Sequence, residues 1–295
     1  MVPSTFYQLL DSGHGRKLEQ FGPVRLIRPS AQALWRPQQS AQMWKSSAAE
    51  FVRKSDGHGK WCVSPGCKLP QEWKMQVSAQ VSVLVRPTDF GHLGLFPEHH
   101  GQKALQSAVV GLRNRGCAQV RILNLFGYTG IPTLELAAAG AHLTHVDASK
   151  ASVQWAKENQ QLSGLQDAPV RWIVDDVGKY VARLVRRQEK FSGILLDPPS
   201  FGRGTKNEVW KIEEHLLSLL EQLAQLIDWD HFAFFQLSAH SQSTSAEVLS
   251  RLLAQGLSRP VERIHRGEMV VRAATSGTWD LPCGAYARLT EAEHK

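Results

Sequence analysis

Short apolar runs separated by turn residues characterise the first part of the chain. YQLLD (7–11) and PVRLIRP (23–29) flank a glycine-containing segment and predict a hairpin. AQVSVLVRP (79–87) alternates apolar and polar positions, as a half-buried strand does. These patterns predict a small strand-rich α+β domain over residues 1–87, followed by a second domain over residues 88–295.

From about residue 104, apolar runs of strand length alternate with longer helical patterns. The predicted strands cover residues 119–126, 142–147, 170–176, 192–199 and 231–238. The predicted helices cover residues 133–140, 152–164, 178–188, 208–227 and 246–256. Such alternation indicates an α/β fold with a parallel sheet covered by helices on both faces. Because such sheets bind ligands at the carboxyl ends of their strands, the residues after each strand are the functional candidates.

A glycine loop, NLFGYTG, follows the first of these strands. Its candidate residues are Asn124, Phe126, Gly127, Tyr128, Thr129 and Gly130. Glycine lets the backbone turn sharply and approach a ligand closely. The loop has neither the dinucleotide fingerprint nor the Lys-Ser/Thr of a phosphate-binding loop, so it suits a cofactor without a pyrophosphate. An ordinary strand–helix turn is the alternative.

Acidic residues end the next two predicted strands. Asp147, followed by Ala148, lies about 20 residues beyond the glycine loop, where a carboxylate can accept hydrogen bonds from both hydroxyls of a ribose. Asp176 ends the third strand and is a candidate acceptor for the amino group of an adenine. For both residues the alternative is a cap on the following helix, although Ser149 could cap the helix after Asp147.

The fourth predicted strand ends in the sharpest motif of the chain, DPPSFGRG. Two consecutive prolines stiffen the turn because they fix φ twice and remove two amide donors. We expect Asp197, Pro198, Pro199 and Phe201 to form a catalytic pocket for a planar substrate, on which Phe201 stacks. Ser200, Arg203 and Lys206 are the candidate substrate-binding residues, the two basic ones for a substrate phosphate.

Taken together, NLFGYTG, THVDAS and ILLDPPSFGRG resemble a class I S-adenosylmethionine-dependent methyltransferase, and more narrowly the large-subunit ribosomal RNA methyltransferase family. The resemblance covers residues 88–295. It implies a Rossmann-like sheet of seven strands with the last antiparallel, and EMVVRA (268–273) and GAYARLT (284–290) are candidates for the last two. It also implies that S-adenosyl-L-methionine is the cofactor.

The resemblance also implies roles for the strand-end residues. The loop from Asn124 to Gly130 brackets the methionine part of the cofactor, Asp147 holds the ribose and Asp176 the adenine amine. Glu98 and His99, in a segment similar to the family's G-x-F-x-D/E-Q, border the cofactor, although His99 replaces the usual Gln. Many relatives begin with an additional RNA-binding domain, for which residues 1–87 leave no room.

The cysteines bear on the atom that is methylated. Methylation at carbon-5 of cytosine needs attack on the ring by a thiolate. The resemblance implies that relatives with that activity have a cysteine after the fifth strand. This chain has Leu237 to Ser241 there, and its cysteines are Cys62, Cys67, Cys117 and Cys283. We therefore expect direct transfer to nitrogen or oxygen, unless Cys283 folds into the pocket.

Composition narrows the class of protein further. Of 295 residues, 42% are hydrophobic and 21% charged, which is typical of a globular chain. No apolar stretch is long enough to span a membrane, no signal-peptide pattern opens the chain, and four cysteines without close pairing fit a reducing compartment, so we expect a cytoplasmic protein. Cys62 and Cys67, with His58 nearby, suggest a metal site, but no second cysteine pair follows, so we expect a loop there and no metal. Residues 1–100 hold 12 Lys and Arg against 7 Asp and Glu, which favours an RNA partner.

Four tryptophans in residues 1–87 fill a small core or provide a stacking surface for bases. The function expected is methylation of a base in ribosomal RNA, and a homodimer is possible. Three alternatives stay open: a methyltransferase acting on a protein or small molecule, a nicotinamide-dependent oxidoreductase, and a silent RNA-binding relative.

Overall fold

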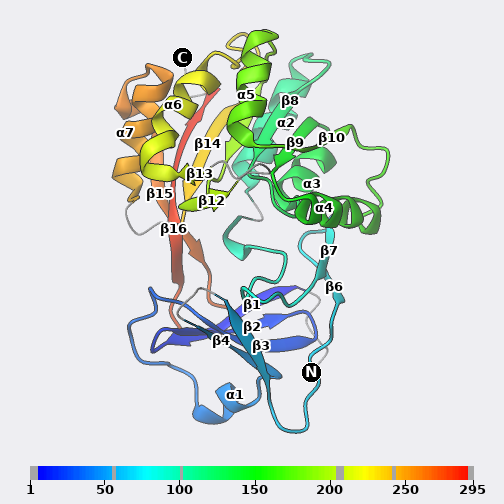
Figure 1. Ribbon diagram of the computed structural model, residues 1–295, viewed down its shortest axis with the longest axis vertical. Coiled ribbons are helices and arrows are strands. Elements are labelled where there is room, and N and C mark those ends of the chain that lie inside the picture. The colour runs from blue at the N-terminus through cyan, green and yellow to red at the C-terminus, as the bar shows by residue number, and fades with distance from the viewer. Residues whose placement is uncertain (1–5, 55–57, 100–101, 204–208, 241–243, 292–295) are drawn as a thin grey trace. The chain divides into compact units, whose positions relative to one another are not determined.

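The protein is described by a computed structural model that covers residues 6–54, 58–99, 102–203, 209–240 and 244–291 (Figure 1). Its internal contacts separate two compact units. Unit 1 comprises Met1–His100 and Val270–Cys283, and unit 2 comprises Gly101–Met269 and Gly284–Lys295. The first boundary between the units therefore lies after His100, whereas the sequence pattern predicts one after residue 87. The sequence pattern does not predict that Val270–Cys283 belongs to unit 1. Among the described residues, no helix is long and apolar enough to span a membrane.

Unit 1 is built on a five-stranded sheet in the order β1-β2-β3-β4-β5, in which β3 and β4 run parallel and the other neighbours antiparallel. Its strands are β1 (Tyr7–Gly13), β2 (Arg16–Phe21), β3 (Val24–Pro29), β4 (Ala49–Arg53) and β5 (Gly59–Val63). The smaller elements are α1 (Ala41–Lys45), the antiparallel pair β6 (Trp73–Gln76) and β7 (Ser82–Val85), and the short helix η1 (Pro97–His99).

The predicted hairpin is wrong in one respect, because a third strand, β2, lies between its two arms. Positive φ values at His14 and Gly15 turn the chain from β1 into β2, and Gly22 turns it into β3. Strand β2 contains buried Glu19 and partly buried Lys17, and these charged positions hide its apolar pattern.

The four tryptophans of unit 1 serve its core. Trp44 and Trp73 are buried. Each indole N–H finds an acceptor within the unit: Ser12 O for Trp35, Asp11 Oδ2 for Trp44, Thr88 O for Trp61 and Phe21 O for Trp73, at 2.8 to 3.0 Å. A buried indole needs such a partner, so Trp44 and Trp73 are hydrogen-bonded core residues, whereas Trp35 and Trp61 are partly exposed.

Unit 2 contains a seven-stranded sheet in the order β10-β9-β8-β11-β14-β16-β15. Its strands are β8 (Arg121–Leu125), β9 (His142–Asp147), β10 (Val170–Val174), β11 (Gly193–Leu196), β14 (Phe234–Ala239), β15 (His265–Val271) and β16 (Leu281–Thr290). The first five in spatial order are parallel, and β16 runs antiparallel to β14. The predicted fold class, including the antiparallel last strand, is confirmed.

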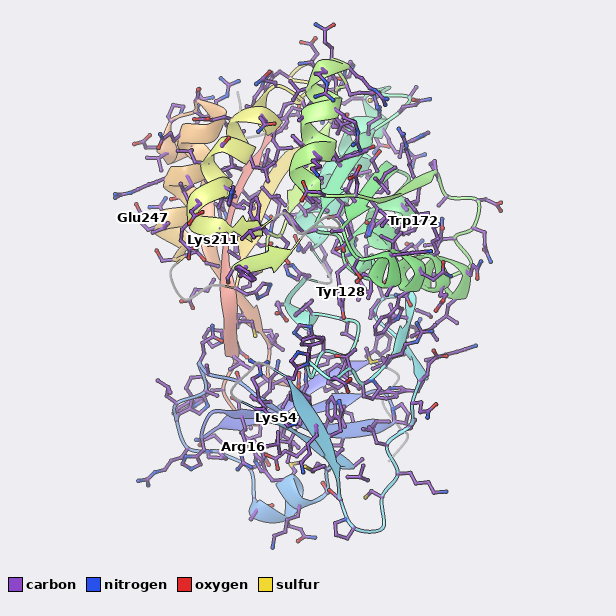
Figure 2. All side chains as sticks on the ribbon, viewed as in Figure 1. Arg16, Lys54, Tyr128, Trp172, Lys211 and Glu247 are labelled. Carbon is purple, nitrogen blue, oxygen red and sulfur yellow. The ribbon has the colours of Figure 1, made fainter. Side chains whose placement is uncertain are left out.

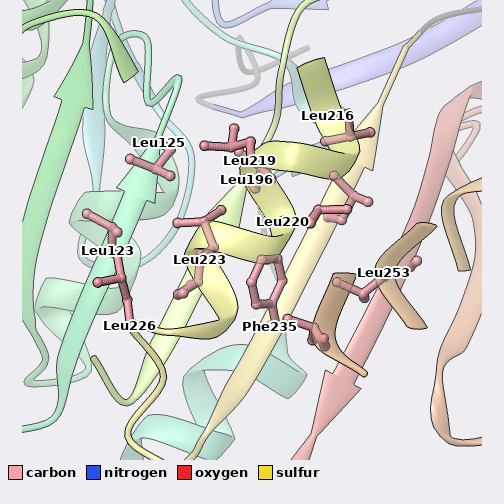
Figure 3. Close-up of a cluster of buried hydrophobic side chains, with 14 of the residues drawn as sticks. Leu123, Leu125, Leu196, Leu216, Leu219, Leu220, Leu223, Leu226, Phe235 and Leu253 are labelled. Carbon is pink, nitrogen blue, oxygen red and sulfur yellow. The ribbon is translucent and has the colours of Figure 1, made fainter. Parts of the chain in front are cut away.

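Helices cover both faces of this sheet. They are α2 (Lys103–Asn114), α3 (Ile131–Ala138), α4 (Lys150–Leu162), α5 (Val177–Arg186), α6 (Ile212–Ala224), α7 (Ala246–Leu257) and the short η2 (Val261–Arg263). Leu123 and Phe235 pack with α5, α6 and α7 in the largest core cluster, part of which Figure 3 shows. Their neighbours Ile122 and Phe234 point to the other face and pack with α2 and α3. This alternation follows from the two-residue period of a strand.

Two elements differ from the sequence-based expectation. The predicted helix over 208–227 begins only at Ile212, because Val209–Lys211 form a short strand, β13, that pairs with β12 (Phe201–Arg203). Helix α2 was not predicted, although Leu105, Val109 and Leu112 are buried at helical spacing.

Candidate active site

Five parallel strands of unit 2 end at the same edge of the sheet, and the predicted site residues of this unit follow them. Four of these strands carry the motifs: the glycine loop follows β8, Asp147 ends β9, Asp176 follows β10, and Asp197 follows β11. The fifth, β14, ends in Ala239 and is followed by His240. The structure therefore brings to one edge what the sequence separates by more than one hundred residues.

The glycine loop is held in an uncommon backbone conformation. Phe126 and Tyr128 have φ values of 56° and 50°, in the left-handed region that residues with a Cβ rarely adopt. Gly127 N–H donates to Val146 O at 3.1 Å, and Asn159 Nδ2 donates to Thr129 O at 3.0 Å. Gly130 caps α3 with a φ of 82°. The loop is thus tied to β9 and α4.

Asp147, at the end of β9, forms a hydrogen bond with the same loop. Its Oδ2 accepts the backbone N–H of Tyr128 at 2.9 Å, and its Oδ1 accepts that of Ser149 at 2.8 Å. Burial raises the pKa of Asp147, while these two amide bonds oppose the rise. Ser149 caps α4 by accepting from Ser152 N–H, which leaves Asp147 for another task, and Ala148 between them is partly exposed.

A buried polar cluster that the sequence reasoning missed supports the loop. Asn124 Nδ2 donates to Thr133 Oγ1 at 2.8 Å, and Thr133 Oγ1 lies 2.9 Å from Nδ1 of His145. All three residues are buried. The available signal was a histidine two positions before Asp147, hence on the same face of the strand.

At the end of β10, Asp176 acts as the N-cap of α5. Its Oδ1 accepts the backbone N–H of Lys179 at 2.9 Å, which is the capping alternative left open by the sequence. Its neighbour Asp175 pairs with Arg183. A cap uses one carboxylate oxygen of Asp176, and the other oxygen keeps its lone pairs.

Asp197 begins the Asp-Pro-Pro turn and is held by the neighbouring strand β14. Ser238 Oγ donates to its Oδ1 at 2.6 Å, and His240 Nε2 lies 3.6 Å from its Oδ2. Pro198 is buried, whereas Pro199, Ser200 and Phe201 are exposed, Phe201 by 56%. An exposed aromatic ring beside a fixed carboxylate suits a planar ligand.

Trp210, on β13, links this turn to the glycine loop. Its Nε1 donates to Pro199 O at 2.7 Å, and its ring centroid lies 5.1 Å from that of Phe126. The sequence did not single out Trp210, because it reads as the start of the long helical pattern. Arg203 ends β12, and Lys206 lies outside the described residues.

The two remaining predicted residues, Glu98 and His99, lie in η1 of unit 1, where His99 is buried. Cys283 also belongs to unit 1, where it packs against the cluster that contains Leu9 and Leu281. Burial is the main cause that raises the pKa of this thiol to about 12. Cys62 and Cys67 are exposed residues of unit 1. Cys117 lies between α2 and β8, before the first strand of the unit 2 sheet.

Comparison with known proteins places this chain in a family. A family model described as "Conserved hypothetical protein 95" matches residues 104–226. A solved structure titled as the SAM-dependent methyltransferase from Agrobacterium tumefaciens superposes with a TM-score of 0.88 at 38% identity, covering 96% of this chain and 90% of that one. The chain belongs to the S-adenosylmethionine-dependent methyltransferases. The family expected from the sequence motifs is thus confirmed, and the oxidoreductase alternative is set aside.

Other matches agree with this assignment. A putative SAM-dependent methyltransferase from Streptococcus mutans, 16% identical, superposes with a TM-score of 0.68 over 97% of this chain and 76% of its own, which shows the shared fold. Ribosomal RNA large subunit methyltransferase K/L of Pseudomonas entomophila is 33% identical over 198 residues. That match spans 63% of this chain but a quarter (25%) of the relative.

Proposed function

We propose that this protein transfers the methyl group of S-adenosylmethionine to a nitrogen or oxygen atom of a base in ribosomal RNA. The observation that carries the proposal is the meeting, at one sheet edge, of a glycine loop held by Asp147 with an Asp-Pro-Pro turn held by Ser238. The first is suited to hold a cofactor, and the second is suited to present a planar acceptor beside it.

The residues of the glycine loop fit this cofactor. Asp147 uses one lone pair of each oxygen for a backbone amide, so both oxygens retain acceptor capacity for the two ribose hydroxyls. The second oxygen of Asp176 is available for the adenine amino group, and the loop from Asn124 to Gly130 lies against the methionine part. We place Glu98 and His99 at the cofactor only through the family resemblance.

The cofactor, when bound, supplies an electrophilic methyl group on a sulfonium sulfur. The protein's share is to position the acceptor, exclude water and take up its proton. Asp197, fixed by Ser238, accepts a hydrogen bond from the acceptor N–H or O–H and so aligns the lone pair with the methyl group. As the acceptor lone pair forms the new bond to carbon, the carbon–sulfur bond would break with its electron pair left on sulfur. The acceptor then loses its proton toward this carboxylate, while Phe201 stacks on the base.

The placement of the cysteines supports a nitrogen or oxygen acceptor. Methylation at carbon-5 of cytosine needs a thiolate that attacks the ring. Ser238 and His240 occupy the end of β14, and Cys283 has a pKa of about 12, so its thiol is protonated at neutral pH. Direct displacement needs no covalent intermediate and uses the residues that are present.

RNA as the substrate class rests on two supports. Two curated relatives, 33% and 31% identical to this chain, are named ribosomal RNA large subunit methyltransferase K/L, and residues 1–100 carry a net charge of +5. Basic surface favours an anionic partner. Ser200, Arg203 and Lys206 are the residues that we assign to contacts with this substrate, while a cytoplasmic location and a homodimer stay predictions.

The test is methyl transfer from radiolabelled S-adenosylmethionine into a lysate of cells that lack the gene. The proposal expects label that nuclease releases and protease does not. Label released only by protease would move the substrate to protein, and label in neither fraction, with the cofactor bound, would point to a small molecule or a silent relative.

A further inference from the structure

His145 lies in β9 at a position where a parallel strand usually carries an apolar residue. Its side chain is fully buried and shares a face of the strand with Asp147. A Cβ built on Gly127 would lie only 2.4 Å from Cε1 of the imidazole. The ring therefore occupies the space beside the glycine loop, and the loop follows its present path because residue 127 has no side chain.

A chain of side-chain hydrogen bonds fixes this ring. Asn124 and His145 are register partners on β8 and β9, and Thr133 of α3 lies between them. The Asn124 amide donates to the Thr133 hydroxyl at 2.8 Å, and the hydroxyl lies 2.9 Å from Nδ1 of His145. Since a hydroxyl can accept one bond and donate another, the chain can run from Asn124 through Thr133 to the ring.

The ring is neutral in this setting. Burial lowers the pKa of His145 to about 3, with a smaller opposing effect from the Tyr128 backbone. A neutral imidazole has one acceptor nitrogen, which Nδ1 can provide to the Thr133 hydroxyl. Trp172, labelled with Tyr128 in Figure 2, packs on the ring at a centroid distance of 4.7 Å. The same indole lies 3.3 Å from a Cβ built on Gly130, so it leaves little room for a side chain at this position of the loop.

We propose that His145, held by Thr133 and Asn124, is a positioning residue that sets the glycine loop in its cofactor-binding shape before the cofactor arrives. The left-handed backbone of Phe126 and Tyr128 is strained, and it persists only where the surrounding structure holds it in place. Asp147 holds the loop at the Tyr128 amide, and the imidazole holds it at Gly127. The inference rests on the proposed function, since it assigns the loop to the methionine part of S-adenosylmethionine.

Thr133 offers the sharpest variants, because it is replaced with little change of shape. Thr133→Val removes the hydroxyl and keeps the branched side chain, whereas Thr133→Ser keeps the hydroxyl. His145→Phe gives a second route, since it keeps an aromatic ring without Nδ1. Binding is measured by calorimetry with two probes, S-adenosylhomocysteine and 5′-methylthioadenosine, which lacks the amino acid part. Thermal melting shows that each variant is folded.

Thr133→Val removes both hydrogen bonds of the hydroxyl, to Asn124 and to His145, and should weaken binding of S-adenosylhomocysteine about tenfold or more. It should leave 5′-methylthioadenosine within about threefold of the wild type, and Thr133→Ser should restore both affinities. His145→Phe should show the same selectivity. Unchanged S-adenosylhomocysteine binding in Thr133→Val overturns the inference, and so does an equal loss for both probes, which a general structural role produces. A wild type that binds neither probe refutes the proposed function itself.

Discussion

Ser238 Oγ donates a 2.6 Å hydrogen bond to Oδ1 of Asp197, and so joins the carboxyl ends of the neighbouring strands β14 and β11. A hydroxyl–carboxylate bond of this length is charge-assisted and stronger than a neutral one. It leaves Oδ2 of Asp197 turned to His240 at 3.6 Å. The carboxylate of the Asp-Pro-Pro turn is therefore fixed in direction before any substrate binds.

Replacing Asp197 should separate catalysis from cofactor binding. Asp197→Asn keeps the size of the side chain and can still accept from Ser238, but it loses the charge that takes up the acceptor proton. We expect the rate of methyl transfer to fall by about 100-fold, a typical contribution of general acid–base catalysis. The affinity for S-adenosylhomocysteine, measured by calorimetry, should change by less than about threefold.

Ser238→Ala should have a smaller effect on the rate of methyl transfer than Asp197→Asn. It removes one hydrogen bond from Asp197 and leaves the charge, so the expected loss of rate is about 10-fold or less. A rate in Asp197→Asn equal to that of the wild type would remove Asp197 from the mechanism.

Asp147→Asn should weaken the cofactor rather than slow the transfer step. The carboxylate of Asp147 accepts hydrogen bonds from the backbone N–H groups of Tyr128 and Ser149. An amide has only one acceptor oxygen, so its NH₂ group would face one of these two N–H donors and that hydrogen bond would be lost. We expect the dissociation constant of S-adenosylhomocysteine to rise by about 10- to 100-fold, from the loss of charge-assisted hydrogen bonds.

Asp228→Asn is the matched control. Asp228 also accepts backbone amides, those of Asp230 and His231, but it lies before β14 at the opposite end of the strand. Its replacement should leave cofactor affinity unchanged. Equal effects of the two variants would contradict the placement of the cofactor at the carboxyl edge.

Cys283→Ala should retain methyl transfer. The thiol is packed within unit 1, its Sγ donates to Leu281 O at 3.4 Å, and its pKa of about 12 keeps it protonated at neutral pH. Activity within about threefold of the wild type is expected, with a modest loss of stability from the small cavity. Loss of transfer in a folded Cys283→Ala, together with a covalent enzyme–RNA adduct in the wild type, would restore the carbon-5 reaction.

Unit 1 should lose stability in acid through Glu19. This carboxylate is fully buried and receives two bonds from Arg28, at 2.7 and 2.8 Å. Burial alone raises the pKa of Glu19, but Arg28 and Lys17 outweigh it and the net shift is downward from 4.5. Because the folded pKa lies below the unfolded one, the pair stabilises the protein above about pH 4.5 and loses this contribution as the pH falls further.

The corresponding variant is Glu19→Gln, which leaves Arg28 charged and buried. We expect a loss of about 3–5 kcal/mol in the free energy of unfolding at pH 7, measured by denaturant titration. The control is Glu50→Gln, which breaks the exposed pair of Glu50 with Arg16 and should cost about 0–1 kcal/mol. Similar losses in both variants would contradict the importance assigned to burial.

The sheet of unit 2 could be predicted from the sequence because its strands and helices differ in the length and spacing of their apolar runs. Strand-end residues such as Asp147 and Asp197 could be selected before any contact was known, since parallel strands place their carboxyl ends together. The residues that support them could not be selected in this way. Thr133 and His145 meet only through the packing of α3 on β9, and the sequence around either residue does not indicate its partner.

Other differences have local causes. Lys17 and Glu19 of β2 face the interior, where Glu19 meets Arg28, so these charged residues interrupt the apolar pattern of the strand. Trp210 reads as the first turn of a helix by its spacing, yet its indole hydrogen bond to Pro199 O and its packing on Phe126 favour the short hairpin of β12 and β13. Tertiary contacts override local periodicity in both places.

The proposed activity is best tested by nucleoside analysis of ribosomal RNA with mass spectrometry. The RNA comes from cells without the gene and from the same cells carrying the wild type or Asp197→Asn. If the protein methylates ribosomal RNA as proposed, one nucleoside methylated on nitrogen or oxygen is absent without the gene, returns with the wild type and does not return with Asp197→Asn. Ribosomal RNA with identical methylation in all strains, or loss of 5-methylcytidine alone, would contradict the proposal.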